Sequence, residues 1–310
     1  MRNLADLLQT IGGNVESLAT KYAIQLGLFR SQIVCPYHTS HQLELQTPPL
    51  STRLGFRCTR NKCHLSHRTT SILHKMRLSA YKALQILFLW SQNTRLAEIC
   101  YKLHVSRPTA QKLCDRIRRA CTWKIDYNST NKMGGVGYTV EIDESMLFSR
   151  HQRRGRRMQS SVWVFGAVCR ETGDLFLQIV TDRTKETLIP IIRQHIELGT
   201  TIISDCWKPY RCLEQQGYHH LTVNHSKTFL NRANGAHNNT IEGVWRWLKH
   251  SLPTSGIKKS RIDAYIKSFQ WQRIYGRRLN SFITVVDHVR QFYERENFTL
   301  FEVSACLFPD

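Results

Sequence analysis

The chain has 310 residues, a length that suggests two or three folded units and a sizeable core. Lysine and arginine number 44 against 23 acidic residues, and the net charge of +21 favours a polyanionic partner, first of all nucleic acid. The ten cysteines do not follow an apolar signal segment, so we expect a reducing, intracellular compartment and not a disulfide-linked secreted protein. The most apolar stretch, 83–90, is far shorter than the roughly 20 residues that cross a bilayer, so we expect no membrane span.

Residues 1–34 and 35–70 differ in pattern. Leucines at helical spacing predict helices on both sides of the Gly12-Gly13 pair in the first segment. The second segment has polar stretches with cysteine and histidine and little apolar periodicity, so something other than a hydrophobic core must hold it. We therefore expect a zinc-ribbon-like, metal-binding module in residues 35–70.

Two pairs of possible metal ligands lie in this module, about 20 residues apart. They are Cys35 with His38, and Cys58 with Cys63. Two short turns at this spacing can close a tetrahedral zinc site, which supplies folding energy to a segment without a core. His64 and His67 compete with His38 as the fourth ligand.

Residues 71–130 are predicted to be helical, with one helix at 78–90 and a second helical stretch from 96 to about 123. The turn at 104–106 divides the second stretch into the outline of a helix-turn-helix. Its second helix has polar and mostly cationic residues that suit a DNA major groove. They are Arg107, Thr109, Gln111, Lys112, Arg116 and Arg119. The alternative is a helical connector with a solvated basic face.

Strand-like segments begin after a glycine-rich hinge at 134–137. Three strands are followed by alternating helices and strands, in the order βββαβαβ. The predicted ranges are 138–142, 161–169, 175–180, 185–196, 200–204, 207–216 and 218–223. This is the order of an α/β, ribonuclease-H-like fold, whose first and fourth strands are central neighbours. We assign it to a catalytic domain of residues 135–255, with the helices of residues 256–310 packing on it.

Three carboxylates stand where this fold would bring them together. Asp143 ends the first strand, Asp205 ends the fourth, and Glu242 opens a helix at 239–252 that packs across the sheet. Each acid alone would suit a strand end or a helix start, but together they form a set of hard oxygen ligands for Mg²⁺ or Mn²⁺. Two such ions can drive an in-line displacement at phosphorus.

Two further charged residues lie near these three acids in the predicted fold. Lys249 lies two turns beyond Glu242 on nearly the same helix face, where its ammonium could hold a DNA phosphate. Glu144 adjoins Asp143 but would face the opposite side of the strand, so it is the weaker choice of ligand.

Several phrases of the sequence are specific enough to indicate a family. They are VEIDES (140–145), RRGRR (153–157), VWVFG (162–166), DRTKETLIPII (182–192), TTIISDCW (200–207), LTVNHS (221–226) and GAHNNTIEGVWRWLK (235–249). The stretch from 140 to about 278 resembles the catalytic region of Merlin-type DNA transposases and their bacterial ISXO2-like relatives. The cysteine-bearing module and the segment 66–69 resemble the amino-terminal region of the same family.

The resemblance implies a catalytic set of residues and a reaction. The implied residues are Asp143, Asp205, Glu242 and the following Lys249. The implied reaction is hydrolysis at the ends of a DNA element, followed by attack of the freed 3′-hydroxyls on target DNA. Relatives usually have cysteine where His38 stands, and some bacterial relatives have asparagine or histidine in place of the third acid. His237 and Asn239 are therefore candidates beside Glu242.

Together these features predict a cut-and-paste DNA transposase that binds double-stranded terminal inverted repeats and target DNA. A second basic cluster is expected to contact DNA as well, at Arg153, Arg154, Arg156 and Arg157. Because both element ends must be held together, we expect a homodimer, located in the nucleus if the host is eukaryotic. The alternatives are a domesticated DNA-binding protein without catalysis, and a ribonuclease-H-like nuclease without strand transfer.

Overall fold

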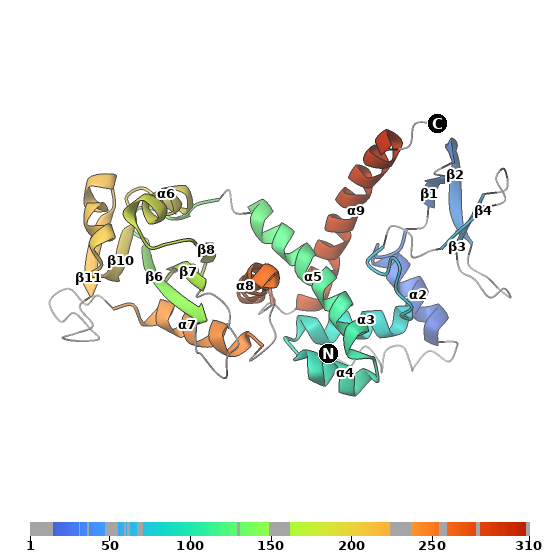
Figure 1. Cartoon of the computed structure of the whole chain (residues 1–310), viewed down its shortest axis with the longest axis horizontal. Helices are drawn as coiled ribbons and strands as arrows, with labels where there is room; N and C mark the ends of the chain where they lie inside the picture. The colour runs from blue at the N-terminus through green and yellow to red at the C-terminus, as the bar shows by residue number, and fades with distance from the viewer. Residues whose placement is uncertain are drawn as a thin grey trace, which may run out of the picture. The chain divides into compact units, whose positions relative to one another are not determined.

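The computed structural model describes twelve ranges of the chain, which divides into two compact units (Figure 1). The ranges are 15–30, 32–35, 37–46, 55–58, 60, 63–66, 71–128, 131–148, 162–223, 237–253, 259–276 and 280–307. The first unit comprises Met1–Lys124 and Tyr275–Asp310, and the second comprises Ile125–Ile274. No helix within the described ranges combines the length and the apolar character that a membrane crossing requires.

Four antiparallel strands form the segment that was predicted to bind a metal. They are β1 (Gln32–Cys35), β2 (His38–Gln46), β3 (Gly55–Cys58) and β4 (Cys63–Ser66), and they pair in chain order. The described residues of this sheet share one small cluster of buried side chains, namely Ile33, Cys35, Leu43, Phe56 and Cys58. So small a core contributes little against the conformational entropy of ordering the segment, which supports the expectation of an additional cross-link.

The remaining described elements of the first unit are helices. They are α2 (Val15–Gln25), α3 (Ala80–Ser91), α4 (Leu96–Leu103), α5 (Arg107–Asn128), whose last residues lie in the second unit, and α9 (Ser281–Leu307). The Glu16 carboxylate accepts the backbone N–H groups of Ala80 and Tyr81 at 2.6 and 3.2 Å. These bonds use N–H groups at the start of α3 that have no partner within the helix, and they fasten α2 to α3.

The last helix was expected on the catalytic domain, together with its predecessor. Instead, α9 belongs to the first unit, where the Phe282 ring packs edge-on against Phe88 at a centroid distance of 5.9 Å. The Gln92 side chain also donates to the Ser281 hydroxyl at 3.3 Å. An amphipathic pattern predicts a helix but not which core its apolar face joins, and here aromatic contacts with α3 decide it.

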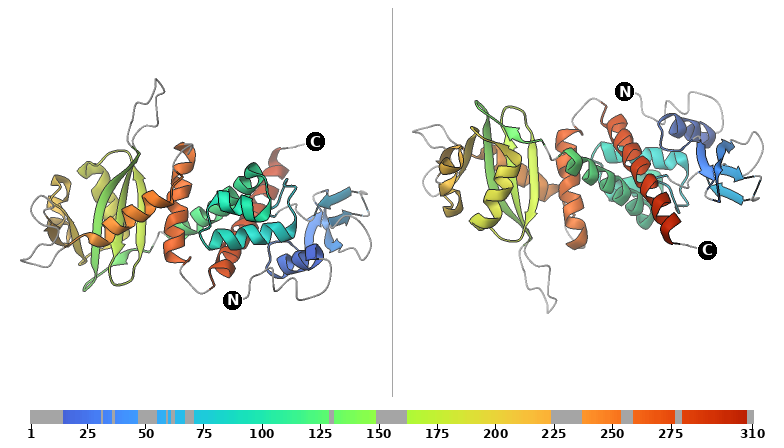
Figure 2. Two further views of the ribbon diagram at one scale, coloured as in Figure 1. Left: turned by 90° about the horizontal axis from the view of Figure 1, so that it is seen from below. Right: turned by 90° about the horizontal axis from the view of Figure 1, so that it is seen from above.

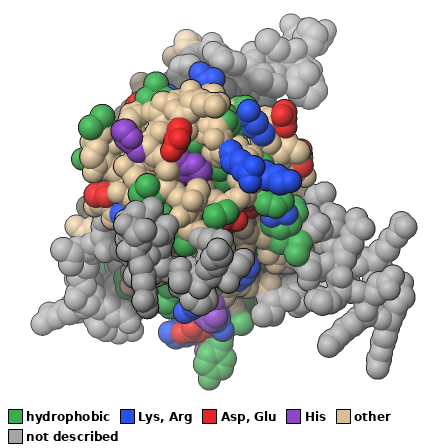
Figure 3. All heavy atoms as spheres, turned by 90° about the vertical axis from the view of Figure 1, so that its left-hand side faces the viewer, with side chains coloured by type: hydrophobic (Ala, Val, Ile, Leu, Met, Phe, Trp, Pro, Cys, Tyr) green, Lys and Arg blue, Asp and Glu red, His purple; other side chains and the backbone are tan. Residues whose placement is uncertain are grey.

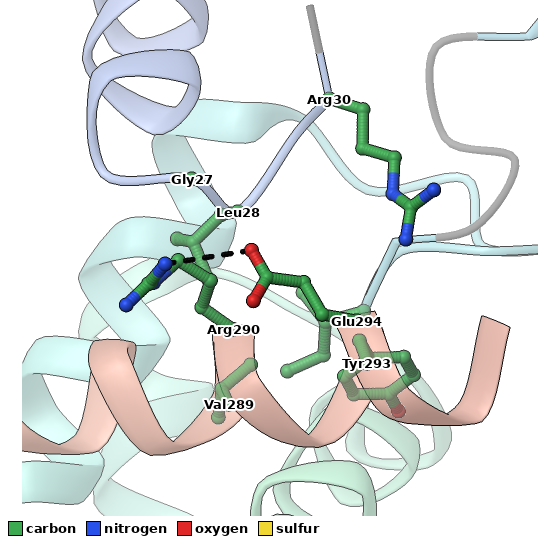
Figure 4. Close-up of a pocket in the computed structure, with 8 residues that line it drawn as sticks. Gly27, Leu28, Arg30, Val289, Arg290, Tyr293 and Glu294 are labelled. Atoms are coloured by element: carbon green, nitrogen blue, oxygen red, sulfur yellow. Dashed lines mark hydrogen bonds and ion pairs between the residues drawn. The ribbon is translucent and has the colours of Figure 1, made fainter. Parts of the chain in front are cut away.

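A close approach between the end of α2 and α9 leaves room for only a glycine at position 27 (Figure 4). Gly27 has a φ of 71°, and a Cβ there would lie 2.3 Å from Cδ of Arg290. Arg290 is held by its own helix, donating to Asp287 at 2.6 Å and Glu294 at 3.5 Å. The small pocket drawn in Figure 4 is lined by residues of this contact, among them Gly27, Arg290 and Glu294, and belongs to it.

The second unit is built on a five-stranded sheet. Its strands are β6 (Thr139–Phe148), β7 (Val162–Cys169), β8 (Leu175–Val180), β10 (Thr201–Asp205) and β11 (His219–Val223), in the order β11-β10-β6-β7-β8. The first three strands are antiparallel, whereas β10 is parallel to both β6 and β11. The first and fourth of these strands are therefore central neighbours, as the sequence predicted. A short parallel pair, β5 (Met133–Gly134) with β9 (Ile196–Glu197), lies apart from this sheet.

Helices cover both faces of the sheet, as the two views of Figure 2 show. One face packs on α6 (Lys185–His195) and the short helix η1 (Lys208–Cys212), and the other on α7 (Asn239–Ser251) and α8 (Lys259–Ile274). The buried cluster on the second face packs α7, with Glu242 in its first turn, against β7 and β8.

The helix predicted at 207–216 differs from the observed structure. The chain forms two 3₁₀ helices there, η1 and η2 (Glu214–Gln216), and Leu213 donates its backbone N–H to the carbonyl oxygen of Tyr210 at 3.0 Å. Tyr210 and Leu213 are both buried, and a separation of three residues fits the tighter turn of a 3₁₀ helix.

Candidate functional site

Asp143 and Asp205 lie on neighbouring strands of the sheet. The ladder between β6 and β10 pairs Glu141 with Ile203, and each strand reaches its aspartate two residues later. Because side chains alternate between the faces of a strand, Asp143 shares a face with Glu141, while Ile142 faces the core under α6. The same alternation on β10 puts Asp205 on the face of Asp143, the face that α7 covers.

The electrostatic environment of Asp143 involves all three predicted acids. Burial raises the pKa of Asp143 to about 6, against hydrogen bonds from the Trp245 indole and the Glu144 backbone that lower it, and the charges of Asp205 and Glu242 raise it further. The fold therefore brings Asp205 and Glu242 close enough to Asp143 for their charges to act on it.

The three acids do not form one tight ligand cluster. Among the described residues, the only group of three whose possible ligand atoms all lie within 4.8 Å of one another is Cys35, His38 and Cys58. Two divalent ions in a phosphoryl-transfer site lie about 3.5 to 4 Å apart, so ligands of different ions need not be that close to one another.

Trp245 on α7 fixes the orientation of Asp143. Its indole nitrogen donates to Oδ2 of Asp143 at 2.9 Å. Gly166 pairs with Asp143 across the β6–β7 ladder, and a Cβ on Gly166 would lie 2.5 Å from the Trp245 ring. The ring therefore lies over the bare backbone of Gly166, and a side chain at this position would push it away from Asp143.

Glu141 joins the central strand to the start of α7, and sequence reasoning did not single it out. Its fully buried carboxylate accepts the backbone N–H of Ile241 at 2.9 Å and the Thr240 hydroxyl at 2.8 Å. It also forms a 2.6 Å ion pair with Arg170, which donates in addition to the carbonyl oxygen of His237. These bonds set where α7 begins on the sheet and hence where Glu242, in its first turn, lies.

The sequence of the second unit matches a known family over almost its whole length. Residues 134–273 match the ISXO2-like transposase domain. This part of the chain is therefore similar to an ISXO2-like transposase domain. A curated relative from Haemophilus influenzae, described as an uncharacterized transposase-like protein, is 27% identical over 99 residues, which cover 32% of this chain and 79% of the relative. The resemblance to ISXO2-like transposases is thus confirmed.

Solved structures of the Mos1 transposase overlap with the chain only loosely. The paired-end complex with the left transposon end has 11% sequence identity and a TM-score of 0.29, covering 68% of this chain and 75% of that chain. The pre-cleavage Mos1 transpososome has 10% identity and a TM-score of 0.26, covering 68% and 76%. At such TM-scores neither structure bears on the arrangement of the site.

The other residues that were predicted to belong to the site differ in their exposure and in their partners. Lys249 is exposed in the last turn of α7, and Asn239 is exposed at the first residue of that helix. His237 lies beside the Glu141–Arg170 pair, with its Nδ1 3.7 Å from a Glu141 oxygen. Burial raises the pKa of Glu144 to about 8; Asp143 and Asp205 raise it further, whereas Arg183 lowers it. Glu144 is thus closer to the acids than its place on the other face suggested.

A second group of possible ligands lies upstream of the transposase domain, in the turns of the small sheet. Cys35, His38 and Cys58 are the cluster described above, and Sγ of Cys58 is 3.9 Å from Nδ1 of His38. Nδ1 of His41 lies 3.4 Å from the same sulfur. The backbone of Cys63 pairs with Cys58, but the side chain of Cys63 lies outside the described residues. Two thiols and an imidazole are a ligand set that suits zinc.

The predicted competitors of His38 and the second basic cluster are not described structurally. The side chains of His64 and His67 fall outside the described residues, as do Arg153, Arg154, Arg156 and Arg157. Their predicted roles stay predictions.

The two helices that were predicted to form a DNA-binding pair are present as α4 and α5, with His104 in the left-handed conformation between them. Arg107, Lys112 and Arg119 are exposed. Lys112 donates to the carbonyl oxygen of Lys75 at 3.3 Å, and the Arg119 guanidinium lies 5.6 Å from the ring centroid of Phe292. Arg116, by contrast, donates to the carbonyl oxygen of Ile72 at 2.6 Å. Within the chain, Thr109 is bonded to the Ser106 hydroxyl at 2.8 Å, and Gln111 to Asp115 at 2.7 Å.

Proposed function

We propose that this protein is a DNA transposase that hydrolyses phosphodiester bonds at the ends of a DNA element and joins the freed ends to target DNA. The observation that carries the proposal is the position of Asp143. Burial and the charges of two further carboxylates raise the pKa of the half-buried Asp143. Because the three negative charges disfavour one another, a divalent cation that binds among them is favoured.

Asp143, Asp205 and Glu242 would hold Mg²⁺ or Mn²⁺, because hard oxygen ligands suit these ions. The bound ions would polarise the phosphate and activate the attacking oxygen. The side chains of the protein supply the geometry. Trp245 keeps one oxygen of Asp143 in place through its 2.9 Å bond. The buried Glu141 fixes the first turn of α7 and with it Glu242.

The remaining predicted residues have supporting roles in the proposal. Lys249 would hold a phosphate of the DNA strand by its exposed ammonium. Arg107, Lys112 and Arg119 would contact the terminal inverted repeats, with Arg116 acting in the packing of α5. A zinc ion held by Cys35, His38 and Cys58, with Cys63 as the predicted fourth ligand, would stabilise the small sheet. Two copies of the chain would hold the two element ends together.

Cleavage of labelled element ends tests the proposal. We expect the full-length protein to cut such DNA in Mg²⁺, and Asp143→Ala or Asp205→Ala to abolish cutting while retaining most of the affinity for the same DNA. Glu186→Gln, which changes an exposed acid on α6, is the matched control and is expected to cut normally. Full cleavage by either aspartate variant would contradict the site, and cutting without any joining to target DNA would favour a nuclease.

A further inference from the structure

Arg183 lies in the loop between β8 and α6, against two tryptophan rings. The carbon at the centre of its guanidinium is 3.9 Å from the ring centroid of Trp163 and 4.8 Å from that of Trp207. Trp163 comes from β7, and Trp207 follows the end of β10. The Trp207 indole nitrogen also donates to the backbone carbonyl oxygen of Arg183 at 3.4 Å. Side chain and backbone of Arg183 are thus held by the same ring.

The hydrogen-bond donors of this guanidinium are not used inside the described part of the chain. Arg183 forms no hydrogen bond or ion pair through its guanidinium with any described residue. Contacts with aromatic rings involve the faces of the guanidinium plane, and they leave the five N–H donors at its edge available. A planar cation that is already ordered loses little entropy when it binds an anion, and its fork of donors matches two oxygens of a phosphate.

The position of this arginine relates it to the proposed site. The backbone N–H of Trp207 donates to Oδ1 of Asp205 at 3.0 Å, so the residue that holds Arg183 also orients one of the three acids. The charge of Arg183 also acts on Glu144, which adjoins Asp143 in the chain. Glu144 and Trp163 face the α6 side of the sheet, so Arg183 approaches the acids from that side and through Trp207, past the end of β10. Trp207 is 39% exposed, so solvent and a ligand can reach this place. On the face of the molecule shown in Figure 3, lysine and arginine side chains gather beside hydrophobic ones.

We propose that Arg183 is a positioning residue that binds a phosphate of the DNA strand next to the carboxylates, with Trp163 and Trp207 holding its guanidinium in place. The inference rests on the proposed function, because it assumes that DNA occupies this site. The alternative is that the three side chains only pack against one another, in which case the charge of Arg183 is irrelevant to DNA.

Affinity measurements on the full-length protein separate these two cases. The probe is a fluorescein-labelled duplex of random sequence with a single-stranded 3′ overhang, and its fluorescence anisotropy is followed over a series of salt concentrations. Ca²⁺ replaces Mg²⁺ so that no cleavage takes place. The variants are Arg183→Gln, Arg183→Lys and Trp207→Ala. The matched control is Arg193→Gln, which removes the same charge from an exposed position in the last turn of α6.

We expect Arg183→Gln to weaken binding about tenfold and to lower the salt slope by about 0.7 to 0.9, the effect of one lost phosphate contact. Trp207→Ala is expected to weaken binding although it removes no charge, because the guanidinium loses its support. Arg183→Lys is expected to keep the salt slope with intermediate affinity, and Arg193→Gln to resemble the wild type. Unchanged far-ultraviolet circular dichroism establishes that each variant is folded.

Equal affinity and salt slope for Arg183→Gln and Arg193→Gln would overturn the inference. That outcome is distinct from a failure of the proposed function, because cleavage plays no part in the measurement. A protein that never cuts DNA but loses affinity in Arg183→Gln and Trp207→Ala would still support the phosphate contact. A protein whose cleavage depends on Asp143, but whose binding ignores Arg183, would refute the contact alone.

Discussion

Trp245 donates its indole N–H to Oδ2 of Asp143 at 2.9 Å, so a residue of α7 orients a carboxylate of the central strand. In Trp245→Phe a smaller aromatic ring replaces the indole and the N–H donor is lost, which raises the pKa of Asp143 further and leaves its carboxylate less well oriented. We expect the affinity for Mn²⁺ to fall about tenfold, as measured by electron paramagnetic resonance titration. Trp247→Phe is the control, since Trp247 lies on the same helix and is 60% exposed. Equal Mn²⁺ affinity in both variants would show that the bond does not matter.

Substitution by alanine is expected to have opposite effects on stability at two glycines of the second unit. In Gly166→Ala the new Cβ would lie 2.5 Å from the Trp245 ring, and we expect a loss of about 1 to 3 kcal/mol in the free energy of unfolding. In Gly243→Ala nothing lies within 4 Å of the new Cβ, and α7 would gain about 0.5 to 1 kcal/mol. Urea denaturation measures both. Destabilisation of the same size at both positions would argue against the close contact between Gly166 and Trp245.

The raised pKa of Asp143 predicts a specific dependence of stability on pH in the metal-free protein. The folded state holds this proton up to about pH 6, whereas the unfolded state releases it near the ordinary aspartate pKa of 3.8. The contribution of Asp143 to stability is therefore present at low pH and is lost as pH rises through about 6.

Asp143→Asn removes this dependence. We expect the variant to be more stable than the wild type by roughly 1 to 2 kcal/mol at neutral pH without metal, with the advantage disappearing towards pH 4. Mg²⁺ should raise the melting temperature of the wild type only. Asp174→Asn, in the exposed turn between β7 and β8, serves as control. An advantage of Asp143→Asn that is independent of pH would contradict this assignment.

Zinc content tests the upstream group of ligands. We expect the purified protein to contain one zinc ion per chain by elemental mass spectrometry, and Cys58→Ser to lose it along with thermal stability. Cys114→Ser is the control, because burial raises the pKa of the Cys114 thiol to about 12 and keeps it protonated. A full zinc content in Cys58→Ser, or none in the wild type, would refute the assignment.

The sequence was a good guide wherever the order of elements determines position. Asp205 ends β10 as predicted, whereas Asp143 lies inside β6, which continues to Phe148 and does not stop at 142. The βββαβαβ order makes these two strands central neighbours, and the ladder between β6 and β10 confirms that pairing. The three antiparallel strands and the helix α7 were predicted from the same order, and the short turn between β7 and β8 leaves those two strands few other arrangements.

Residues whose role depends on tertiary contacts could not be recognised in this way. Glu141 lies two residues before Asp143 on the same face, but its partner Arg170 comes from the end of the next strand. Arg116 was predicted to contact DNA because it is cationic, whereas in the structure its guanidinium donates a hydrogen bond to the carbonyl oxygen of Ile72. A charge pattern indicates that a side chain is polar, and only the fold determines which partner it meets.

A change of ligand type at Asp143 tests most directly whether its carboxylate binds the catalytic metal. Thiolates bind Mg²⁺ poorly but accept softer ions. We predict that Asp143→Cys does not cleave an element end in Mg²⁺ and regains cleavage when Mn²⁺ replaces Mg²⁺. The single variant Cys206→Ser is the control and is expected to cleave in both ions as the wild type does. Cleavage by Asp143→Cys at the wild-type rate in Mg²⁺ would contradict the account.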